Sequence, residues 1–233
     1  MPESLLGVGL YTIPQAARLL RLSSQKLRRW ADGYLFLSDG ARRRSEPLIH
    51  RDLQEREDEV ILTFQDLLEL HMVRFFRSEG VSIQTIRKAA EQATLLYKTT
   101  HPFTVKGFET DGKSIFATLE EQGVEGISKA ELLQDLIRSQ MVMESIARPF
   151  FRQIEFEEME PSRWFPNGKG GGIVIDPQRS FGKPIEKVSG IPTETLYNMA
   201  RGGEKIENIA HWYKIDVETV HEAVRYENSL LAA

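Results

Sequence analysis

Two helix-start signals near the N-terminus constrain the fold more than any other feature of this chain. Thr12-Ile13-Pro14-Gln15 places a capping threonine before the first turn, a glutamine at the capping-box position, and a proline where a helix tolerates it. The predicted helix runs to about Leu20, where "RLSS" interrupts it, and Ser23 or Ser24 can cap a second helix. A separation of about three residues is typical of a helix-turn-helix. We therefore predict that motif here.

The second predicted helix, within "SSQKLRRWAD", carries a cationic outer face. Leu27, Trp30 and Ala31 fall on the face expected to be buried. The remaining positions suit contact with a duplex, where an arginine bidentate to guanine contributes ~1–3 kcal/mol of discrimination. A solvated helix face around a core tryptophan is the alternative interpretation. The candidate DNA-binding residues of this helix are Ser24, Gln25, Lys26, Arg28 and Arg29.

A hairpin is predicted next, and it would act as a wing. Tyr34–Leu37 is a short apolar strand, Ser38-Asp39-Gly40 is a turn signal, and Leu48–His50 is a possible return strand. Arg42, Arg43 and Arg44 would then lie near the wing tip and complete the candidate DNA-binding set. Because helix and wing would face one duplex, the arginines favour the DNA interpretation. If ~5 phosphates are neutralised, a plot of the logarithm of DNA affinity against the logarithm of salt concentration should have a slope of about -4.5.

The charge distribution agrees with a basic N-terminal surface. The chain of 233 residues has a formal net charge of -4, which by itself argues against nucleic-acid binding. Residues 1–51, however, contain nine Lys or Arg and four acids, so they carry +5 and the remainder carries -9. A basic end on an acidic body indicates two separate interaction surfaces.

The middle of the chain shows a mixture of helix and strand signals. Helices are expected from Thr63 to just before Gly80, from Ser82 to about Tyr97, and from Ser128 until Pro149 limits it. Residues 103–108 and 114–119 flank Thr110-Asp111-Gly112-Lys113, which predicts another hairpin. Residues 152–160 could form a strand that ends in an acidic cluster.

The last part of the chain follows the glycine-rich "PNGKGGG" (166–172), which predicts a linker. It is not a phosphate-binding P-loop, because Gly170 rather than Ser or Thr follows Lys169. Beyond a strand at 173–175, three short helices are expected at 193–201, 204–212 and about 217–229, and they form a second helix-turn-helix candidate. Acids on its third helix favour dimerisation or protein binding over DNA binding, although the latter stays open.

Several function classes are disfavoured. The chain has no cysteine, so disulfides and thiolate metal sites are excluded, and its five histidines have no metal-ligand spacing. No nucleophile–base set and no paired carboxylates stand out, so we expect no catalytic residue, no metal, no cofactor and no enzyme activity. There is no apolar run near 18 residues and no signal-peptide pattern, so we expect a cytoplasmic protein without a membrane partner.

The first ~100 residues resemble a MerR-type winged helix. The resemblance rests on "YTIPQAARLLRLSSQKLRRWADGYL" and on "LTFQDLLELHMVRFFRSEGVSIQTIRKA". It departs from that family because the helix from Ser82 stops near Tyr97, whereas such regulators usually end in a long dimerisation helix. A thiol-based metal sensor is also disfavoured by the missing cysteines.

The last ~60 residues resemble a bacterial antitoxin family that was long known only as a domain of unknown function. The matching features of "IDPQRSFGKPIEKVSGIPTETLYNMARGGEKIENIAHWYKIDVETVHEAVRYE" are the Ile-Asp-Pro, Phe-Gly-x-Pro, Gly-Ile-Pro-Thr and Ile-Ala-x-x-Tyr motifs. The combination with a MerR-like half resembles the larger VapB-like antitoxins of type II toxin-antitoxin systems. The resemblance implies a PIN-type toxin partner, which would be a metal-dependent ribonuclease.

Together these features predict a mainly α chain with small β hairpins (α+β). We expect a winged-helix DNA-binding domain at 1–98, a central α+β region for dimerisation or partner binding at 99–165, a linker at 166–172, and an antitoxin-family helix-turn-helix domain at 173–233. The expected function is an antitoxin that neutralises a PIN-type ribonuclease and represses its own operon as a homodimer on operator DNA. A stand-alone MerR-like regulator that binds a small effector, and an excisionase-like DNA-binding protein, are the alternatives.

Overall fold

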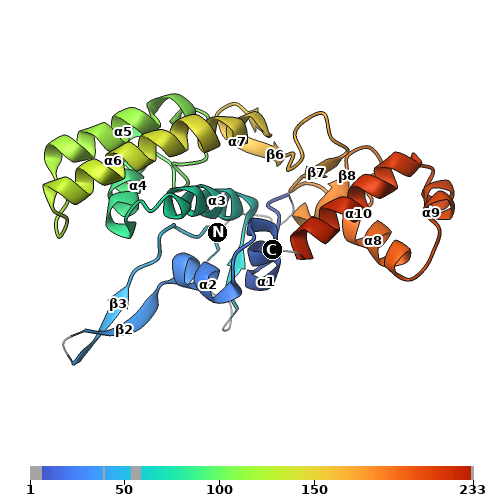
Figure 1. Cartoon of the computed structure of the whole chain (residues 1–233), viewed down its shortest axis with the longest axis horizontal. Helices are drawn as coiled ribbons and strands as arrows, with labels where there is room; N and C mark the ends of the chain where they lie inside the picture. The colour runs from blue at the N-terminus through green and yellow to red at the C-terminus, as the bar shows by residue number, and fades with distance from the viewer. Residues whose placement is uncertain (1–6, 39, 54–58, 232–233) are drawn as a thin grey trace. The chain divides into compact units, whose positions relative to one another are not determined.

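The structure, a computed structural model, describes residues 7–38, 40–53 and 59–231 and divides them into two compact units (Figure 1). Unit 1 comprises residues 11–151 and 156–161, and unit 2 comprises residues 7–10, 152–155 and 162–231. Helices dominate both units and the sheets are small, so the expected α+β class is confirmed. Within the described ranges, every helix is too short or too polar to cross a membrane.

Unit 1 begins with the predicted pair of helices, α1 (Ile13–Leu20) and α2 (Ser24–Asp32). Thr12 and Gln15 form the predicted capping box, and the Ser23 hydroxyl accepts a hydrogen bond from the backbone N–H of Lys26 at 3.3 Å. The apolar face of α2 is buried as expected. The helix starts were therefore readable from local capping chemistry.

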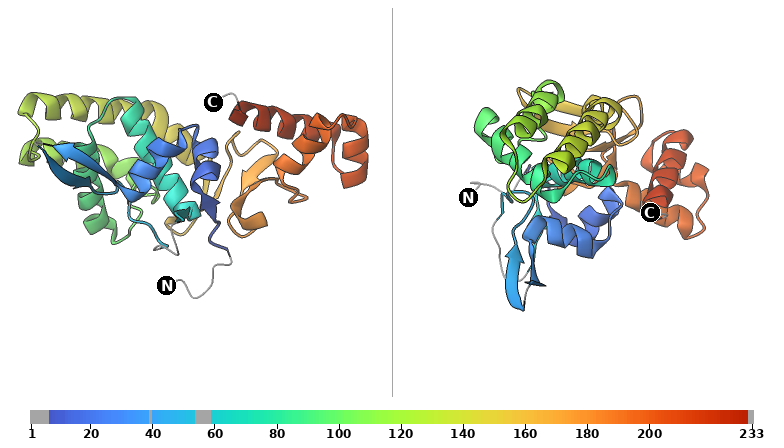
Figure 2. Two further views of the ribbon diagram at one scale, coloured as in Figure 1. Left: turned by 90° about the horizontal axis from the view of Figure 1, so that it is seen from below. Right: turned by 60° about the vertical axis from the view of Figure 1, so that its left-hand side comes forward.

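The β2 (Tyr34–Ser38) and β3 (Ala41–Ser45) hairpin differs from the prediction in its return strand. The arginines themselves form β3, whereas Leu48 and Ile49 lie in bends and are buried in the core. The turn is tight, so pairing resumes at Ala41 before the apolar residues are reached. Figures 1 and 2 show the hairpin extending away from the helices of unit 1. Asp39 of the predicted turn lies outside the described residues.

The core of unit 1 is built on α3 (Phe64–Ser78) and α4 (Ile83–Tyr97), whose predicted starts are confirmed. Thr63 and Asp66 form a capping box for α3, and Ser82 caps α4. The two-residue strands β1 (Tyr11–Thr12) and β4 (Ile61–Leu62) pair antiparallel just before α1 and α3. This pairing places the starts of the two helices close together.

The predicted hairpin around Thr110–Lys113 is wrong, because these residues lie inside α5 (Phe108–Gln122). Gly112 is buried, and a side-chain carbon there would come within 2.8 Å of the Met143 Cε atom. The glycine therefore permits close helix packing and does not mark a turn. Figure 1 shows α5 running beside α6 (Lys129–Val142), with which it is in contact.

Pro149 does not end the helical stretch that begins at Ser128. A π-helical turn, η1 (Met143–Ala147), follows α6, and Pro149 is the second residue of α7 (Arg148–Arg152). A π turn widens the backbone spiral, which relieves the clash of a proline ring with the preceding turn. The apolar side chains of Leu133, Ile137 and Met141 on α6 are exposed.

A four-stranded antiparallel sheet has the order β5 (Ile154–Glu157), β6 (Glu160–Trp164), β7 (Ile173–Ile175) and β8 (Pro184–Glu186). The strand predicted at 173–175 is confirmed, the one predicted at 152–160 is confirmed only over Ile154–Glu157, and β6 and β8 were missed. In unit 2, the glycine-rich residues 166–172 form turns between β6 and β7. A short 3-10 turn, η2 (Ser180–Gly182), lies between β7 and β8.

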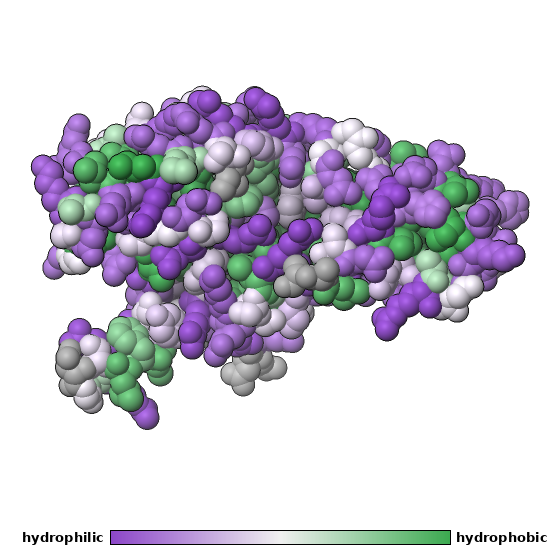
Figure 3. All heavy atoms as spheres, viewed as in Figure 1, coloured by the Kyte–Doolittle hydropathy of each residue, from purple (hydrophilic) through white to green (hydrophobic). Residues whose placement is uncertain are grey.

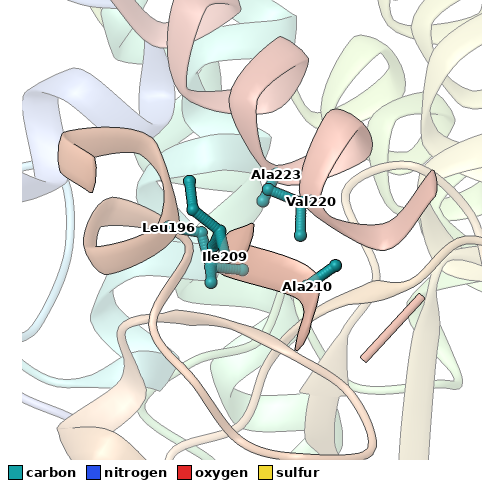
Figure 4. Packing of buried hydrophobic residues seen from close by; sticks show 5 residues of the cluster. All are labelled: Leu196, Ile209, Ala210, Val220 and Ala223. Atoms are coloured by element: carbon teal, nitrogen blue, oxygen red, sulfur yellow. The ribbon is translucent and has the colours of Figure 1, made fainter. Parts of the chain in front are cut away.

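Three helices complete unit 2: α8 (Thr193–Arg201), α9 (Ile206–Tyr213) and α10 (Val217–Leu231). They enclose a small core, and Figure 4 shows its side chains converging. Val217, the first residue of α10, is 40 % exposed. The buried members are Leu196, Ile209, Ala210, Val220 and Ala223.

A buried charge network joins separate segments of unit 1. His101 Nε2 lies 2.8 Å from Asp52 Oδ1 and 3.7 Å from Asp66 Oδ1. Asp66 also accepts the Thr63 N–H at 2.8 Å, and Asp52 accepts the Thr63 hydroxyl at 2.8 Å. Glu69, on the same helix as Asp66, accepts the Phe103 N–H. The network fixes the segment after the hairpin to α3 and to residues 101–103.

Burial raises the pKa of Glu69 to about 8, against the opposing effects of His101 and the Phe103 hydrogen bond. The folded chain therefore holds a proton that the unfolded chain loses above about pH 4.5. Stability attributable to this group must fall as pH rises from about 5 to 8, by at most about 1.4 kcal/mol per pH unit.

We expect Glu69→Gln to remove this contribution, because the neutral amide still offers an oxygen to Phe103. Denaturant unfolding of both proteins from pH 5 to pH 8 should show the free energy of unfolding falling less steeply for the variant. Glu121→Gln, at an exposed position of α5, is the matched control and should run parallel to the wild type. If the free energy of unfolding depended on pH in the same way for Glu69→Gln and the wild type, the conclusion that the Glu69 carboxyl is buried and protonated would be contradicted.

Candidate nucleic-acid interface

The outer face of α2 presents every candidate residue of that helix to solvent. Ser24, Gln25, Lys26, Arg28 and Arg29 are all exposed. The opposite face is anchored by Leu27, Trp30 and Ala31, which are buried. Because these three side chains fix the rotation of the helix, the polar and cationic positions all lie on its solvent-exposed side.

Aromatic rings support two of these cations. Lys26 Nζ lies 5.0 Å from the centroid of the Trp30 ring, and the Arg29 guanidinium carbon lies 5.1 Å from the centroid of the Tyr34 ring. Such contacts hold a charge in place without neutralising it. Trp30 is thus a core residue, as predicted, whose ring also contacts a cation.

The hairpin is fixed to the C-terminal end of α2 by several contacts. The Leu48 N–H donates to the Trp30 carbonyl at 2.8 Å, and Arg44 Nη2 donates to the Asp32 carbonyl at 3.4 Å. Arg51 forms an ion pair with the Asp32 carboxylate at 3.2 Å. These contacts couple the direction of the hairpin to that of α2.

Gly33 makes this junction possible. Its backbone has φ 76° and ψ -173°, a region that residues with a side chain hardly enter. A side-chain carbon at this position would also lie 2.3 Å from the Ser45 carbonyl oxygen. The chain therefore needs glycine here both for the turn and for the close approach of β3.

Arg87 of α4 holds the far end of β3. Its guanidinium donates to the Ser45 hydroxyl at 3.1 Å and to the Glu46 carbonyl. The base of the hairpin is therefore attached to two helices. Sequence reasoning missed Gly33, Arg51 and Arg87, although a glycine directly after a predicted helix was an available signal.

The hairpin register distributes the three arginines over both faces. Leu35 pairs with Arg44 and Leu37 with Arg42, so these four side chains share one face, while Phe36 pairs with Arg43 on the other. The sequence prediction placed the arginines near the tip; they occupy the three central positions of β3, with Arg42 nearest the turn. All three are exposed.

The leucines of the first face are unusually exposed, at 69 % for Leu35 and 75 % for Leu37. Figure 3 shows apolar surface on the projecting hairpin. Exposed apolar side chains interleaved with arginines indicate a contact surface for a partner that is both anionic and able to accept apolar groups.

The cations of this region are not cancelled by nearby acids. In the ranges that the structure describes, no carboxylate lies within ion-pair distance of the side chains in question. These side chains are Lys26, Arg28, Arg29, Arg42 and Arg44. We refer to them, with Ser24, Gln25 and Arg43, as the cationic face; this name denotes the set and not one side of the hairpin, since Arg43 lies on the side opposite Arg42 and Arg44.

Asp52, Asp66 and His101 offer the kinds of atoms that bind metals. One atom from each lies within 4.8 Å of the others, although the three residues are far apart in the sequence, which is why histidine spacing gave no sign of them. Their hydrogen bonds to Thr63 and to one another account for the arrangement as a structural network. His71 is buried between the rings of Phe75 and Phe150.

Comparison with known proteins gives two partial family matches. Residues 9–90 match a family described as "Putative DNA-binding HTH domain", and residues 173–226 match "Protein of unknown function (DUF433)". The first match contains α1, α2, the hairpin and α3. The second spans β7, β8 and most of the three-helix part of unit 2.

One curated relative and one solved structure are similar over nearly the whole chain. The relative, described as "Putative antitoxin VapB45" from Mycobacterium tuberculosis (strain ATCC 25618 / H37Rv), is 25% identical over 230 residues, which cover 95% of each chain. The crystal structure of Rv2018 from Mycobacterium tuberculosis has a TM-score of 0.71 at 22% identity and covers 94% of this chain and 98% of that chain. The overall fold is therefore one that has been observed experimentally.

The contribution of close packing at Gly33 can be measured by comparing its replacement with the replacement of a glycine that has the same φ. Gly40 also has φ 76°, but a side-chain carbon there would meet nothing within 4 Å. We expect Gly40→Ala to lower the free energy of unfolding by about 1–2 kcal/mol from backbone strain alone.

Gly33→Ala should cost more than Gly40→Ala, by about 1 kcal/mol or more, because the added carbon meets the Ser45 carbonyl. Denaturant unfolding of the two variants side by side measures the difference. Equal losses would show that close packing at the α2–hairpin junction contributes nothing.

Proposed function

We propose that this chain is an antitoxin that binds operator DNA through its cationic face and neutralises a PIN-type ribonuclease. The observation that carries the DNA half is the set of exposed cations on α2 and the hairpin, two elements that a hydrogen bond and an ion pair connect at their junction. The match of residues 9–90 to a DNA-binding helix-turn-helix description and the likeness to an antitoxin over 95% of the chain support it.

In this proposal α2 enters the major groove and the hairpin contacts the flanking backbone, as in a MerR-type winged helix. Ser24, Gln25 and Arg28 would reach base edges, and the remaining cations would contact phosphates. One such module buries too little surface for tight binding, so the protein would act as a homodimer on a two-fold operator and repress its own operon.

The toxin half of the proposal uses surfaces outside residues 1–98. An exposed apolar row on α6 consists of Leu133, Ile137 and Met141, which are spaced four residues apart and are 47 %, 53 % and 55 % exposed. Such a row is typical of a protein-binding or dimerisation surface. The proposed roles are thus DNA binding for 1–98, dimerisation or partner binding for 99–165, and antitoxin-family contacts for 173–233 after the glycine-rich segment 166–172.

A second candidate function is that of an architectural DNA-binding protein, similar to an excisionase. It is favoured by one observation, the exposed Leu35 and Leu37 beside Arg42 and Arg44 on the same hairpin face. Apolar side chains flanked by arginines can wedge between base steps and bend a duplex.

The proposed DNA binding is tested by removing one positive charge from α2 and one from the hairpin. We expect Arg28→Ala plus Arg43→Ala to weaken binding to the chain's own promoter DNA by about tenfold or more, and to reduce the salt slope by about 2. The control, Arg201→Ala plus Arg225→Ala, removes the same charge from exposed positions of unit 2. Gel-shift titrations at several salt concentrations measure both, and equal behaviour of the two double variants would exclude the cationic face as the DNA site.

The toxin half is tested by co-expression with the protein of the neighbouring gene. We expect the two proteins to co-elute in size-exclusion chromatography, and the ribonuclease activity of the partner to fall when this chain is added. Leu133→Ser plus Ile137→Ser should weaken the complex or the homodimer if the α6 row is a contact surface, whereas Leu95→Ser, which is also exposed, is the control. Separate elution and unchanged ribonuclease activity would contradict the antitoxin proposal.

A further inference from the structure

Unit 2 contains a hollow of about 260 Å³ in which basic side chains outnumber acidic ones. The lining side chains come from different segments: Arg163 from β6, Lys169 from the glycine-rich turn, Arg179 from the loop after β7, and Lys187 from the turn after β8. The lining also includes the carboxylates of Glu155 and Asp176. Four cations against two acids give the hollow a formal charge of +2.

Both acids of the hollow form ion pairs with the same arginine. Arg163 Nη1 lies 3.3 Å from Glu155 Oε2, and Arg163 Nε lies 3.4 Å from Asp176 Oδ2. Asp176 also accepts the Gln178 N–H at 2.9 Å. Both acids are thus paired with Arg163, and Lys169, Arg179 and Lys187 supply the excess of positive charge in the lining.

Two of those cations are held by neutral backbone oxygens. Arg179 donates to the carbonyls of Lys187 at 2.7 Å and Val188 at 3.2 Å, and Lys187 Nζ donates to the Gly171 carbonyl at 3.0 Å. A carbonyl orients a cation but does not cancel its charge. Within the described ranges, no carboxylate lies at ion-pair distance from Lys169, Arg179 or Lys187.

Nearby acids outside the lining are already bound elsewhere. The Glu186 carboxylate accepts the N–H groups of Val188 and Ser189, and the Glu222 carboxylate accepts the Gly172 N–H at 2.9 Å. These carboxylates stabilise the turns that carry the cations. An N–H hydrogen bond orients these carboxylates but does not cancel their charge, so the excess of cations is a property of the lining of the hollow itself.

We propose that this hollow binds a phosphate dianion, either as inorganic phosphate or as the terminal phosphate of a small metabolite. The formal charge of +2 matches a dianion, and the volume lies just below the range of pockets that enclose drug-sized ligands. A guanidinium and two ammonium groups are the donors that recognise phosphate. Duplex DNA presents singly charged phosphodiesters on a broad convex surface, which suits an exposed face better than a hollow.

The glycine-rich segment acquires a role through this proposal. It lacks the Ser or Thr of a P-loop, and it contributes the side chain of Lys169 and the Gly171 carbonyl that positions Lys187. The phosphate would be held by side-chain cations from three segments. The site is independent of the cationic face of unit 1, so it stands or falls separately from the proposed DNA binding.

The experiment titrates inorganic phosphate into the full-length chain at constant ionic strength, with calorimetry and amide NMR as readouts. We expect saturable binding, competition by sulfate but not by chloride, and shifted amide signals at Gly171 and Gly190, since Gly190 packs against the Arg179 guanidinium. Lys169→Gln plus Lys187→Gln should weaken binding about tenfold for each lost cation.

The matched control is Lys183→Gln, which removes a charge from the same loop region, where Lys183 pairs with Glu194 instead. It should leave phosphate affinity unchanged. The absence of saturable shifts in the wild-type chain, equal effects of chloride and phosphate, or binding of duplex DNA alone at these residues would each overturn the proposal. Because the wild-type titration decides by itself, a variant that fails to fold does not obscure the result.

Discussion

The α2–hairpin junction is the constraint on which the rest of unit 1 depends. Gly33 lets the chain reverse while β3 passes close to it, and Asp32 accepts hydrogen bonds from Arg44 and Arg51 at this point. Without this junction, the helix and the hairpin would be two basic elements with independent directions. With it, the direction of the hairpin is coupled to that of α2, whose rotation is already fixed by Leu27 and Trp30.

The two units separate positive charge into two different kinds of site. In unit 1 the cations are exposed on a helix and a projecting hairpin, which suits a large anionic polymer. In unit 2 the cations line a hollow and are oriented by backbone carbonyls, which suits a small anion. A net charge of -4 for the whole chain conceals both features, so local distribution is more informative than the sum.

Local signals in the sequence were sufficient to predict most helices, whereas contacts between distant segments could not be predicted from it. Thr12, Ser23, Thr63 and Ser82 cap helices as predicted, because a cap depends on residues three or four positions away. Gly112 was misread as a turn because only its packing against Met143 reveals its role. The return strand was misplaced because an arginine run reads as a loop, although exposed strands tolerate such residues. The candidate DNA-binding residues could be named from charge and helix position, but the junction and the hollow combine residues from distant segments.

The central claim is that α2 and the hairpin contact one stretch of duplex together. The chain has no cysteine, so single cysteines at Gln25 on α2 and Ala41 on the hairpin can each carry a DNA-cleaving iron chelate. Cleavage of the chain's own promoter DNA should then map from both positions to the same half-site, within about one helical turn of ~10 base pairs. Cleavage from one position only, or from the two positions at unrelated sites, would contradict a shared DNA-binding face.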